Sequence, residues 1–174
     1  MRIFTLTAEL TLPLPIDRVF AFFADAGNLE AITPDSLSFH ILTPRPIPMH
    51  PGAIIDYRLR LMGIPFRWRT LIEEWNPPHR FVDRQLRGPY RLWHHTHTFE
   101  PAHDPVSGEE STLVRDFVRY AVPLGAIPRR LFVLPQINAI FAHRQRRIAH
   151  LLLGRSLAAY PPIRHGEEAA ARPS

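Results

Sequence analysis

The sequence predicts an α+β domain in which a seven-stranded, curved antiparallel sheet wraps around a long C-terminal helix. Residues 2–12 alternate apolar and polar side chains as a half-buried strand does. Similar segments follow between residues 36 and 121, separated by short turns that contain proline and glycine. Residues 128–153 instead repeat apolar side chains at helical spacing. Short links between consecutive strands indicate antiparallel neighbours, and the long helix is the element that can cover their apolar face.

Two short helices are expected after the first strand. Pro15 lies just beyond strand 2–12 and suits the first turn of a helix over residues 15–24. A second helix over residues 26–32 should end before Pro34, because the residue before a proline disfavours helical geometry. The first of these helices has one apolar face, made by Ile16, Val19, Phe20 and Phe23.

The rest of the chain predicts six more strands and the long helix. Pro135 should kink or divide helix 128–153, and Gly154 is a suitable residue to end it. Proline, glycine, glutamate and alanine dominate from residue 161 onward, which predicts a disordered tail over 161–174. We therefore expect a single domain over residues 1–160. The six strands are expected over residues 36–43, 53–62, 65–75, 80–87, 90–100 and 111–121.

Composition excludes several classes of function. The chain of 174 residues has no cysteine, which excludes disulfides, thiolate catalysis and cysteine-type zinc sites. All 21 basic residues are arginine, so Schiff-base chemistry through lysine is excluded as well. The net charge of +5 is spread along the chain and no nucleic-acid motif accompanies it, so we expect no nucleic-acid partner. No apolar run reaches the roughly 18 residues of a membrane span, and we expect a cytoplasmic protein without stable membrane insertion.

Strand 90–100 is the most informative segment of the sequence. Side chains two residues apart lie on the same face of a strand, so Trp93, His95, His97 and Phe99 form one row. A row that begins and ends with large aromatic residues should face the core. Because an unpaired polar atom is costly among apolar groups, the two histidines must be paired there or line a cavity.

Three segments carry a resemblance to a known family, and their order along the chain matters as much as their sequences. They are LPLPIDRVFAFFADAGNLEAITP, GIPFRWRTLIEEWNPPHRFVDRQLRGPYRLWHHTHTFEP and STLVRDFVRYAVPLGAIP, the last of which precedes the long helix. Together they resemble the SRPBCC superfamily, whose helix-grip fold is shared by START domains, Bet v 1-like proteins and polyketide cyclases. The resemblance covers residues 2 to about 155. It is greatest to uncharacterised bacterial members that bind ligands, some of which accompany or are fused to sugar-nucleotide epimerase-like proteins.

The resemblance implies a cavity between the sheet and the C-terminal helix. Our leading hypothesis is a non-enzymatic protein that holds an amphipathic or hydrophobic ligand there, such as a lipid, a quinone or a polyketide-like molecule. One alternative is a cofactor-independent cyclase or dehydratase that uses a His/Asp pair in the same cavity. A second is an interaction module whose cavity is vestigial. An epimerase-like partner and a homodimer are left open, and no cofactor is expected.

Candidate cavity residues follow from strand alternation and from the apolar face of the long helix. Paired with Asp83 or Asp116, either His95 or His97 could act as a general acid or base, and Tyr120 could polarise a carbonyl. The catalytic candidates are therefore His95, His97 and Asp116. The same groups could instead orient a ligand or only satisfy one another in a wet core. The candidate ligand-binding residues are Tyr57, Trp68, Asp83, Gln85, Trp93, His95, His97, Phe99, Asp116, Tyr120 and Phe141.

Two further hypotheses concern charged residues. His95 and His97 could supply two ligands to a metal ion, but a third would have to come from Asp83 or Asp116 and the spacing in the sequence fixes neither, so no metal site is predicted. The arginines of the long helix are expected to form a solvated face, with attraction to an anionic lipid or a phosphate-bearing ligand as the alternative. These arginines are Arg144, Arg146 and Arg147.

Overall fold

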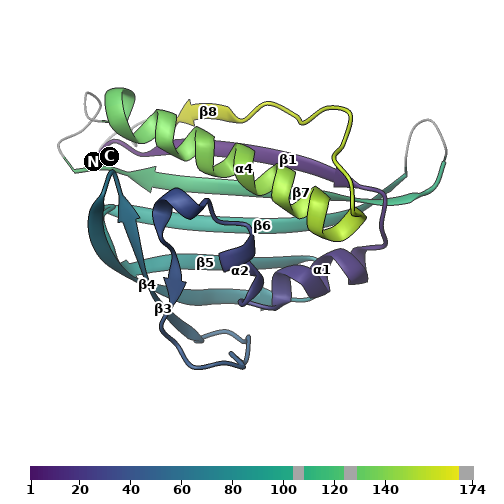
Figure 1. Cartoon of the computed structure of the whole chain (residues 1–174), viewed down its shortest axis with the longest axis horizontal. Coiled ribbons are helices and arrows are strands. Elements are labelled where there is room, and N and C mark those ends of the chain that lie inside the picture. Colours follow the sequence, from purple (N-terminus) through teal and green to yellow (C-terminus); the bar gives the residue numbers. More distant parts are fainter. Residues whose placement is uncertain (104–107, 124–128, 169–174) are drawn as a thin grey trace, which may run out of the picture.

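Eight strands form one open sheet that is crossed by a long helix (Figure 1). The computed structural model describes residues 1–103, 108–123 and 129–168. Every pair of neighbouring strands is antiparallel, in the order β2-β3-β4-β5-β6-β7-β1-β8. The strands are β1 (Phe4–Leu12), β2 (His40–Ile41), β3 (Ile54–Leu61), β4 (Ile64–Asn76), β5 (Arg80–Arg87), β6 (Leu92–His103), β7 (Glu110–Ala121) and β8 (Arg164–Glu167).

Short helices connect β1 to β2, and the long helix follows β7. These elements are α1 (Ile16–Ala24), α2 (Asn28–Ala31), the 3-10 turn η1 (Asp35–Leu37), the π-helical turn η2 (Arg129–Val133) and α4 (Leu134–Leu153). The helix expected over 128–153 is divided as predicted: η2 ends at Val133, and α4 begins at Leu134 with Pro135 in its first turn. Gly154 ends α4 in a left-handed conformation with φ 68°, and its N–H donates to the carbonyl of His150.

Two sequence-based expectations are wrong in part. The strand expected over residues 36–43 is reduced to β2, because η1 occupies its first residues and Ser38 takes a left-handed conformation with φ 44°. Residues 164–167, expected in a disordered tail, form β8 on the free edge of β1. The sheet therefore has eight strands rather than seven. The last part of the expected tail, 169–174, and residue 128 lie outside the described residues.

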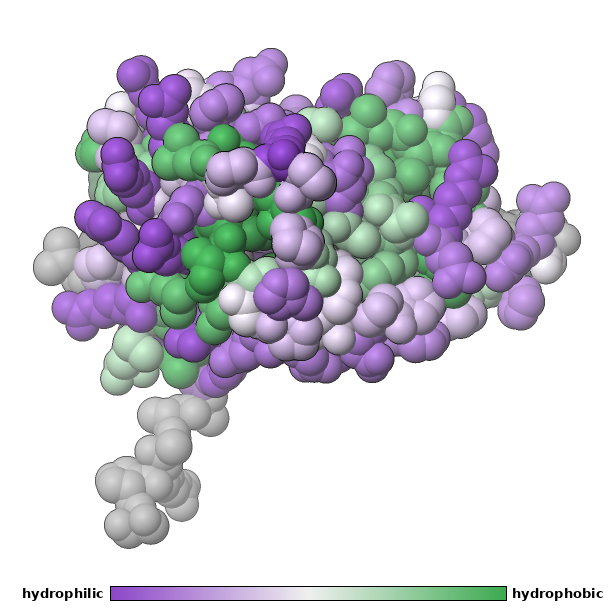
Figure 2. Space-filling model, turned by 90° about the horizontal axis from the view of Figure 1, so that it is seen from below, coloured by the Kyte–Doolittle hydropathy of each residue, from purple (hydrophilic) through white to green (hydrophobic). Residues whose placement is uncertain are grey.

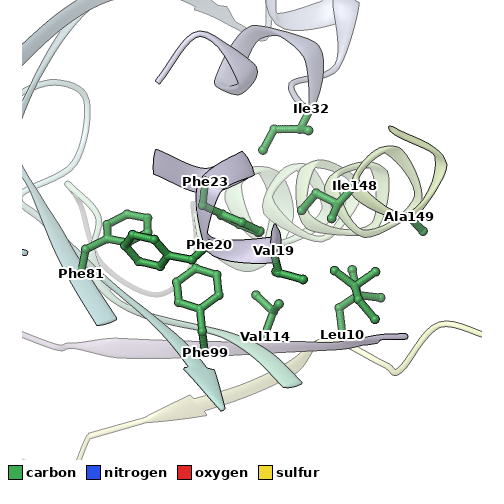
Figure 3. Packing of buried hydrophobic residues seen from close by; sticks show 11 residues of the cluster. Leu10, Val19, Phe20, Phe23, Ile32, Phe81, Phe99, Val114, Ile148 and Ala149 are labelled. Carbon is green, nitrogen blue, oxygen red and sulfur yellow. The ribbon is translucent and has the colours of Figure 1, made fainter. Parts of the chain in front are cut away.

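Among the described residues, the largest cluster of buried hydrophobic side chains lies where α1 packs against the sheet (Figure 3). Phe20 and Phe23 of α1 meet Phe99 of β6 with ring centroids 5.2 and 4.9 Å apart. Val114 of β7 and Ile148 of α4 complete the contact between the layers. This cluster fixes the position of α1 and of the second half of α4 over the sheet.

The outer surface combines apolar and polar areas. On the face shown in Figure 2, apolar residues gather in separate areas with polar side chains between them. Among the helices within the described residues, none has both the length and the apolar character needed to cross a bilayer.

Candidate functional site

The two histidines of β6 lie between two carboxylates on the neighbouring strands. In the sheet, Asp83 of β5 is directly opposite His95, and Asp116 of β7 is directly opposite His97. Directly opposite residues point to the same face of a sheet, so all four side chains meet on the side that α4 covers. His95, His97 and Asp116 are at most 6% exposed.

Each imidazole contacts both carboxylates, through different nitrogens. His95 Nε2 hydrogen-bonds with Asp116 Oδ1 at 3.0 Å, and His97 Nε2 with Asp83 Oδ2 at 2.9 Å. The other nitrogen of His95, Nδ1, lies 3.6 Å from Asp83 Oδ2, which is too far for a hydrogen bond. His97 Nδ1 lies 2.7 Å from Asp116 Oδ1, but it is not aligned for a hydrogen bond and acts as a charge contact.

Aromatic side chains hold the two imidazole rings in place. The rings of His95 and His97 have centroids 3.8 Å apart, and His97 stacks on Phe81 at 4.0 Å with an angle of 17° between the planes. Phe141 of α4 lies over His95 at 5.7 Å. Large apolar neighbours on both sides exclude water and fix the ring orientation, which strengthens the electrostatic interactions within the cluster.

Arg144 of α4 completes the cluster, and its position corrects an expectation. Instead of a solvated helix face, its side chain is 12% exposed, with Nε 3.5 Å from Asp116 Oδ2. Its guanidinium also lies 5.6 Å from the ring of Phe23. A signal for this position exists in the sequence: Arg144 is three residues after Phe141 and four before Ile148, so it shares their buried helix face.

These contacts set the charges of the cluster. Burial alone raises the pKa of Asp116, but the Arg144 charge and the histidine hydrogen bonds outweigh it and hold that pKa well below its ordinary value. Burial also opposes ionisation of Asp83, yet His97 and His95 lower its pKa. Burial lowers the pKa of His97, and the two carboxylates outweigh this and raise it. Burial and the charge of His97 lower the pKa of His95. Of the two imidazoles, His97 therefore holds a second proton more readily than His95.

A cavity of about 190 Å³ opens between the sheet, α4 and the segment from α1 to η1. One water needs only about 10–15 Å³ on the same measure, so the cavity has room for an organic molecule. Its lining is mostly apolar and aromatic, with Arg144, Asp83 and both histidines at one end. Of the residues predicted to bind a ligand, those that line the cavity are Tyr57, Trp68, Asp83, Trp93, His95, His97 and Phe141.

The other four predicted residues lie outside the lining. Gln85 turns away because its amide closes the turn before β6, where Nε2 donates to the carbonyl of Tyr90 at 2.7 Å. Tyr120 is fully buried and accepts a hydrogen bond from Arg129 Nε at 2.9 Å. Phe99 packs against Phe20 and Phe23 in the core around α1 instead of lining the cavity. Asp116 lies behind the two histidines and reaches the cavity only through them.

The open antiparallel sheet that grips a long helix, with a cavity between them, defines the class of protein. No protein-family model matches the chain, and neither does any curated protein. Ara h 8.0201, a Bet v 1 allergen, matches 88% of this chain and 99% of its own, with TM-score 0.59 and 14% identity. TTHA0849 from Thermus thermophilus matches 86% and 97%, with TM-score 0.61 and 17% identity.

A third solved structure has the same fold in a longer protein. It is the nucleoside-diphosphate sugar epimerase from Corynebacterium glutamicum, with TM-score 0.59 and 20% identity. The match covers 83% of this chain but 28% of that one. At these identities the likeness concerns the fold. The chain has a Bet v 1-like fold, which is the fold that the resemblance in its sequence implies.

Proposed function

We propose that the chain binds a small amphipathic molecule, with its apolar body among the aromatic residues of the cavity and its acidic head group at the polar end. The observation that carries the proposal is a mostly apolar cavity whose lining includes one buried charged cluster, made by Asp83, His95, His97 and Arg144, which we call its polar end. Ligand sites have this composition, because apolar walls supply most of the affinity and a few fixed polar groups orient the ligand. The fold agrees, since Bet v 1-like neighbours suggest a ligand-binding scaffold.

The walls of the cavity favour a flat or chain-like apolar body. Tyr57 and Trp68 stack with an angle of 18° between their planes, and Trp93 meets Trp68 edge to face at 5.6 Å. The hydroxyl of Tyr57 is already paired with Thr70 Oγ1 at 2.8 Å, so it presents a ring rather than a free donor. These side chains offer contact area with little demand for hydrogen bonds, which suits a lipid, quinone or polyketide-like molecule.

Calorimetric titration of the purified protein with decanoate and with 1-anilinonaphthalene-8-sulfonate tests the proposal. Both molecules have an apolar body and an acidic head, and we expect each to bind at one site per chain. Ile140 lines the cavity from α4, so Ile140→Trp should fill it and weaken both ligands at least about tenfold, since about 1.4 kcal/mol is a factor of ten.

The matched control is Leu151→Trp, which adds the same side chain at a position of α4 that is 42% exposed. This variant should bind as the unmodified protein does. Equal weakening in the two variants, or no binding to the unmodified chain, would refute the proposal. Native mass spectrometry of the protein as purified would identify a ligand that is already bound.

Catalysis in the same cavity stays a prediction. It is favoured by one observation, the two buried imidazoles hydrogen-bonded to Asp116 and Asp83, where burial lowers the pKa of His95 and the two carboxylates raise that of His97, because such pairs can supply an acid and a base together. An epimerase-like partner and a homodimer also stay predictions, since the match to part of the Corynebacterium glutamicum epimerase concerns the fold alone. The ligand-binding test comes first, since a cavity that binds nothing leaves the catalytic alternative without a substrate site.

A further inference from the structure

One nitrogen of each imidazole converges with Asp83 on a single point. His95 Nδ1 and His97 Nε2 lie 3.6 and 2.9 Å from Asp83 Oδ2, and the three ligand atoms are all within 4.8 Å of one another. Two atoms that bind one metal ion at about 2.1 Å are themselves about 3.0–3.4 Å apart. The two separations from Asp83 Oδ2 are within a few tenths of an ångström of this range, whereas the separation between the two imidazole nitrogens, which can be up to 4.8 Å, has to close to about 3.4 Å when an ion binds. The structure supplies the third ligand that the sequence spacing leaves open.

We propose that His95, His97 and Asp83 bind one divalent transition-metal ion at the polar end of the cavity. His95 would bind through Nδ1, His97 through Nε2 and Asp83 through its carboxylate. Two imidazoles and one carboxylate suit Zn²⁺, Fe²⁺ and Co²⁺ rather than Ca²⁺ or Mg²⁺, which prefer sites built from oxygen alone. The proposal does not depend on the identity of any organic ligand.

The opposite nitrogens of the two rings already have a common partner. Asp116 Oδ1 lies 3.0 Å from His95 Nε2 and 2.7 Å from His97 Nδ1, so one carboxylate oxygen is within reach of both N–H groups. Metal-binding histidines commonly donate their second N–H to a carboxylate, which fixes the tautomer and the ring orientation. Asp116 hydrogen-bonds with His95 Nε2 in this way and makes a charge contact with His97 Nδ1, and Arg144 lies 3.5 Å from its other carboxylate oxygen. Histidines that only neutralised buried carboxylates would not need one nitrogen of each ring to face Asp83 and the other to face Asp116.

The remaining coordination positions face the cavity. Asp83, His95 and His97 all line it, whereas Asp116 lies on the far side of the rings. Three protein ligands with open positions are typical of sites where a metal ion contacts a bound molecule rather than only stabilising the fold. A metal ion here could bind the acidic head group of a cavity ligand directly.

Calorimetric titration of tag-free, EDTA-treated protein with Zn²⁺ tests the site. The expected result is saturable binding of one ion per chain, weakened about 100-fold or more in His95→Asn, His97→Asn and Asp83→Asn. His94→Asn is the matched control, because His94 lies next to His95 on β6 but contacts Glu73 at 3.3 Å instead of the cluster. It should bind Zn²⁺ unchanged. Asp116→Asn should weaken binding about 10–100-fold, as loss of a supporting carboxylate does.

A second measurement uses only the unmodified chain, in case the variants are poorly folded. Co²⁺ should give visible ligand-field absorption at one equivalent, and ¹⁵N resonances of two histidine side chains should shift on addition of Zn²⁺. Absence of saturable binding, of these bands or of these shifts would overturn the proposal, and so would equal losses in His94→Asn and His95→Asn. Ile140→Trp should still bind Zn²⁺, which separates failure of the metal site from failure of the proposed organic ligand.

Discussion

Arg144 carries a guanidinium to the polar end of the cavity, where its Nε has no hydrogen-bond partner among the described residues. The nearest acidic oxygen, Oδ2 of Asp116, is 3.5 Å away. A buried donor without a partner costs about 1–3 kcal/mol, and the cost is greater for a charged group. An acidic head group of a ligand would supply the missing acceptor, so Arg144 should select for acids within the proposed function.

Arg144→Met tests this selectivity, because methionine keeps most of the apolar stem and removes the charge. A hydrogen bond to a charged group contributes about 1.5–3 kcal/mol. Its loss should therefore weaken the binding of decanoate roughly 10–100-fold. The affinity for 1-decanol should change little. Calorimetry measures both. Arg146→Met, at an exposed position two residues along α4, should leave both affinities unchanged. Equal losses for the acid and the alcohol would show that Arg144 acts on packing alone.

Much of the residue-level site could be predicted from the two-residue period of strands. That period places His95 and His97 on one face of β6, and the same reasoning places Asp83 and Asp116 on the faces of their own strands. It could not show which carboxylate meets which histidine, since the register between strands depends on packing across the whole sheet. Arg144 was missed because it belongs to an arginine-rich run that is otherwise polar, although its helical position is a buried one.

At the scale of elements, β8 protects the edge of the sheet. It pairs with β1, whose other edge is taken by β7, so without it β1 would present unpaired backbone groups. Ion pairs reinforce the pairing: Arg2 with Glu167 at 2.6 Å and Arg164 with Glu9 at 2.9 Å. β8 escaped prediction because its residues are polar and show no apolar alternation. The other strand that differs, β2, is short because a left-handed residue ends regular structure before it.

Removal of β8 should destabilise the protein. A chain that ends at residue 160 loses the β1–β8 pairing, and we expect a fall of about 1–3 kcal/mol in the free energy of unfolding, with aggregation at high concentration. Urea denaturation and light scattering measure these effects. A chain that ends at residue 168 keeps β8 and should match the full-length protein. If the shorter chain were equally stable, the predicted domain boundary at residue 160 would be correct and β8 would be dispensable.

At the scale of the whole molecule, packing is uneven across the sheet. The α1 side is filled by a cluster of phenylalanines between α1, β5 and β6, and the cavity lies beside it under the first half of α4, with Phe23 and Phe81 shared between the two. A well-packed core stabilises the fold, whereas side chains that line an empty cavity lack van der Waals contacts on one side. The filled core and the binding space are thus neighbours, and residues such as Phe20 belong to the core without lining the cavity. Substitutions in the two regions should separate stability from binding.

Phe20→Ala and Phe39→Ala test this division with the same chemical change. Phe20 is 5% exposed and meets Trp75 and Phe99 with ring centroids 5.3 and 5.2 Å away, so its loss should cost about 3–5 kcal/mol. Phe39 is only partly buried and lines the cavity beside Tyr57, at 4.7 Å, so its loss should cost about 1 kcal/mol and weaken decanoate binding. Urea denaturation gives the stabilities, and calorimetry under conditions where both variants are folded gives the affinities. A larger stability loss in Phe39→Ala, or a larger affinity loss in Phe20→Ala, would mean that the cavity and the core are not separate units and that ligand binding depends on packing throughout the sheet.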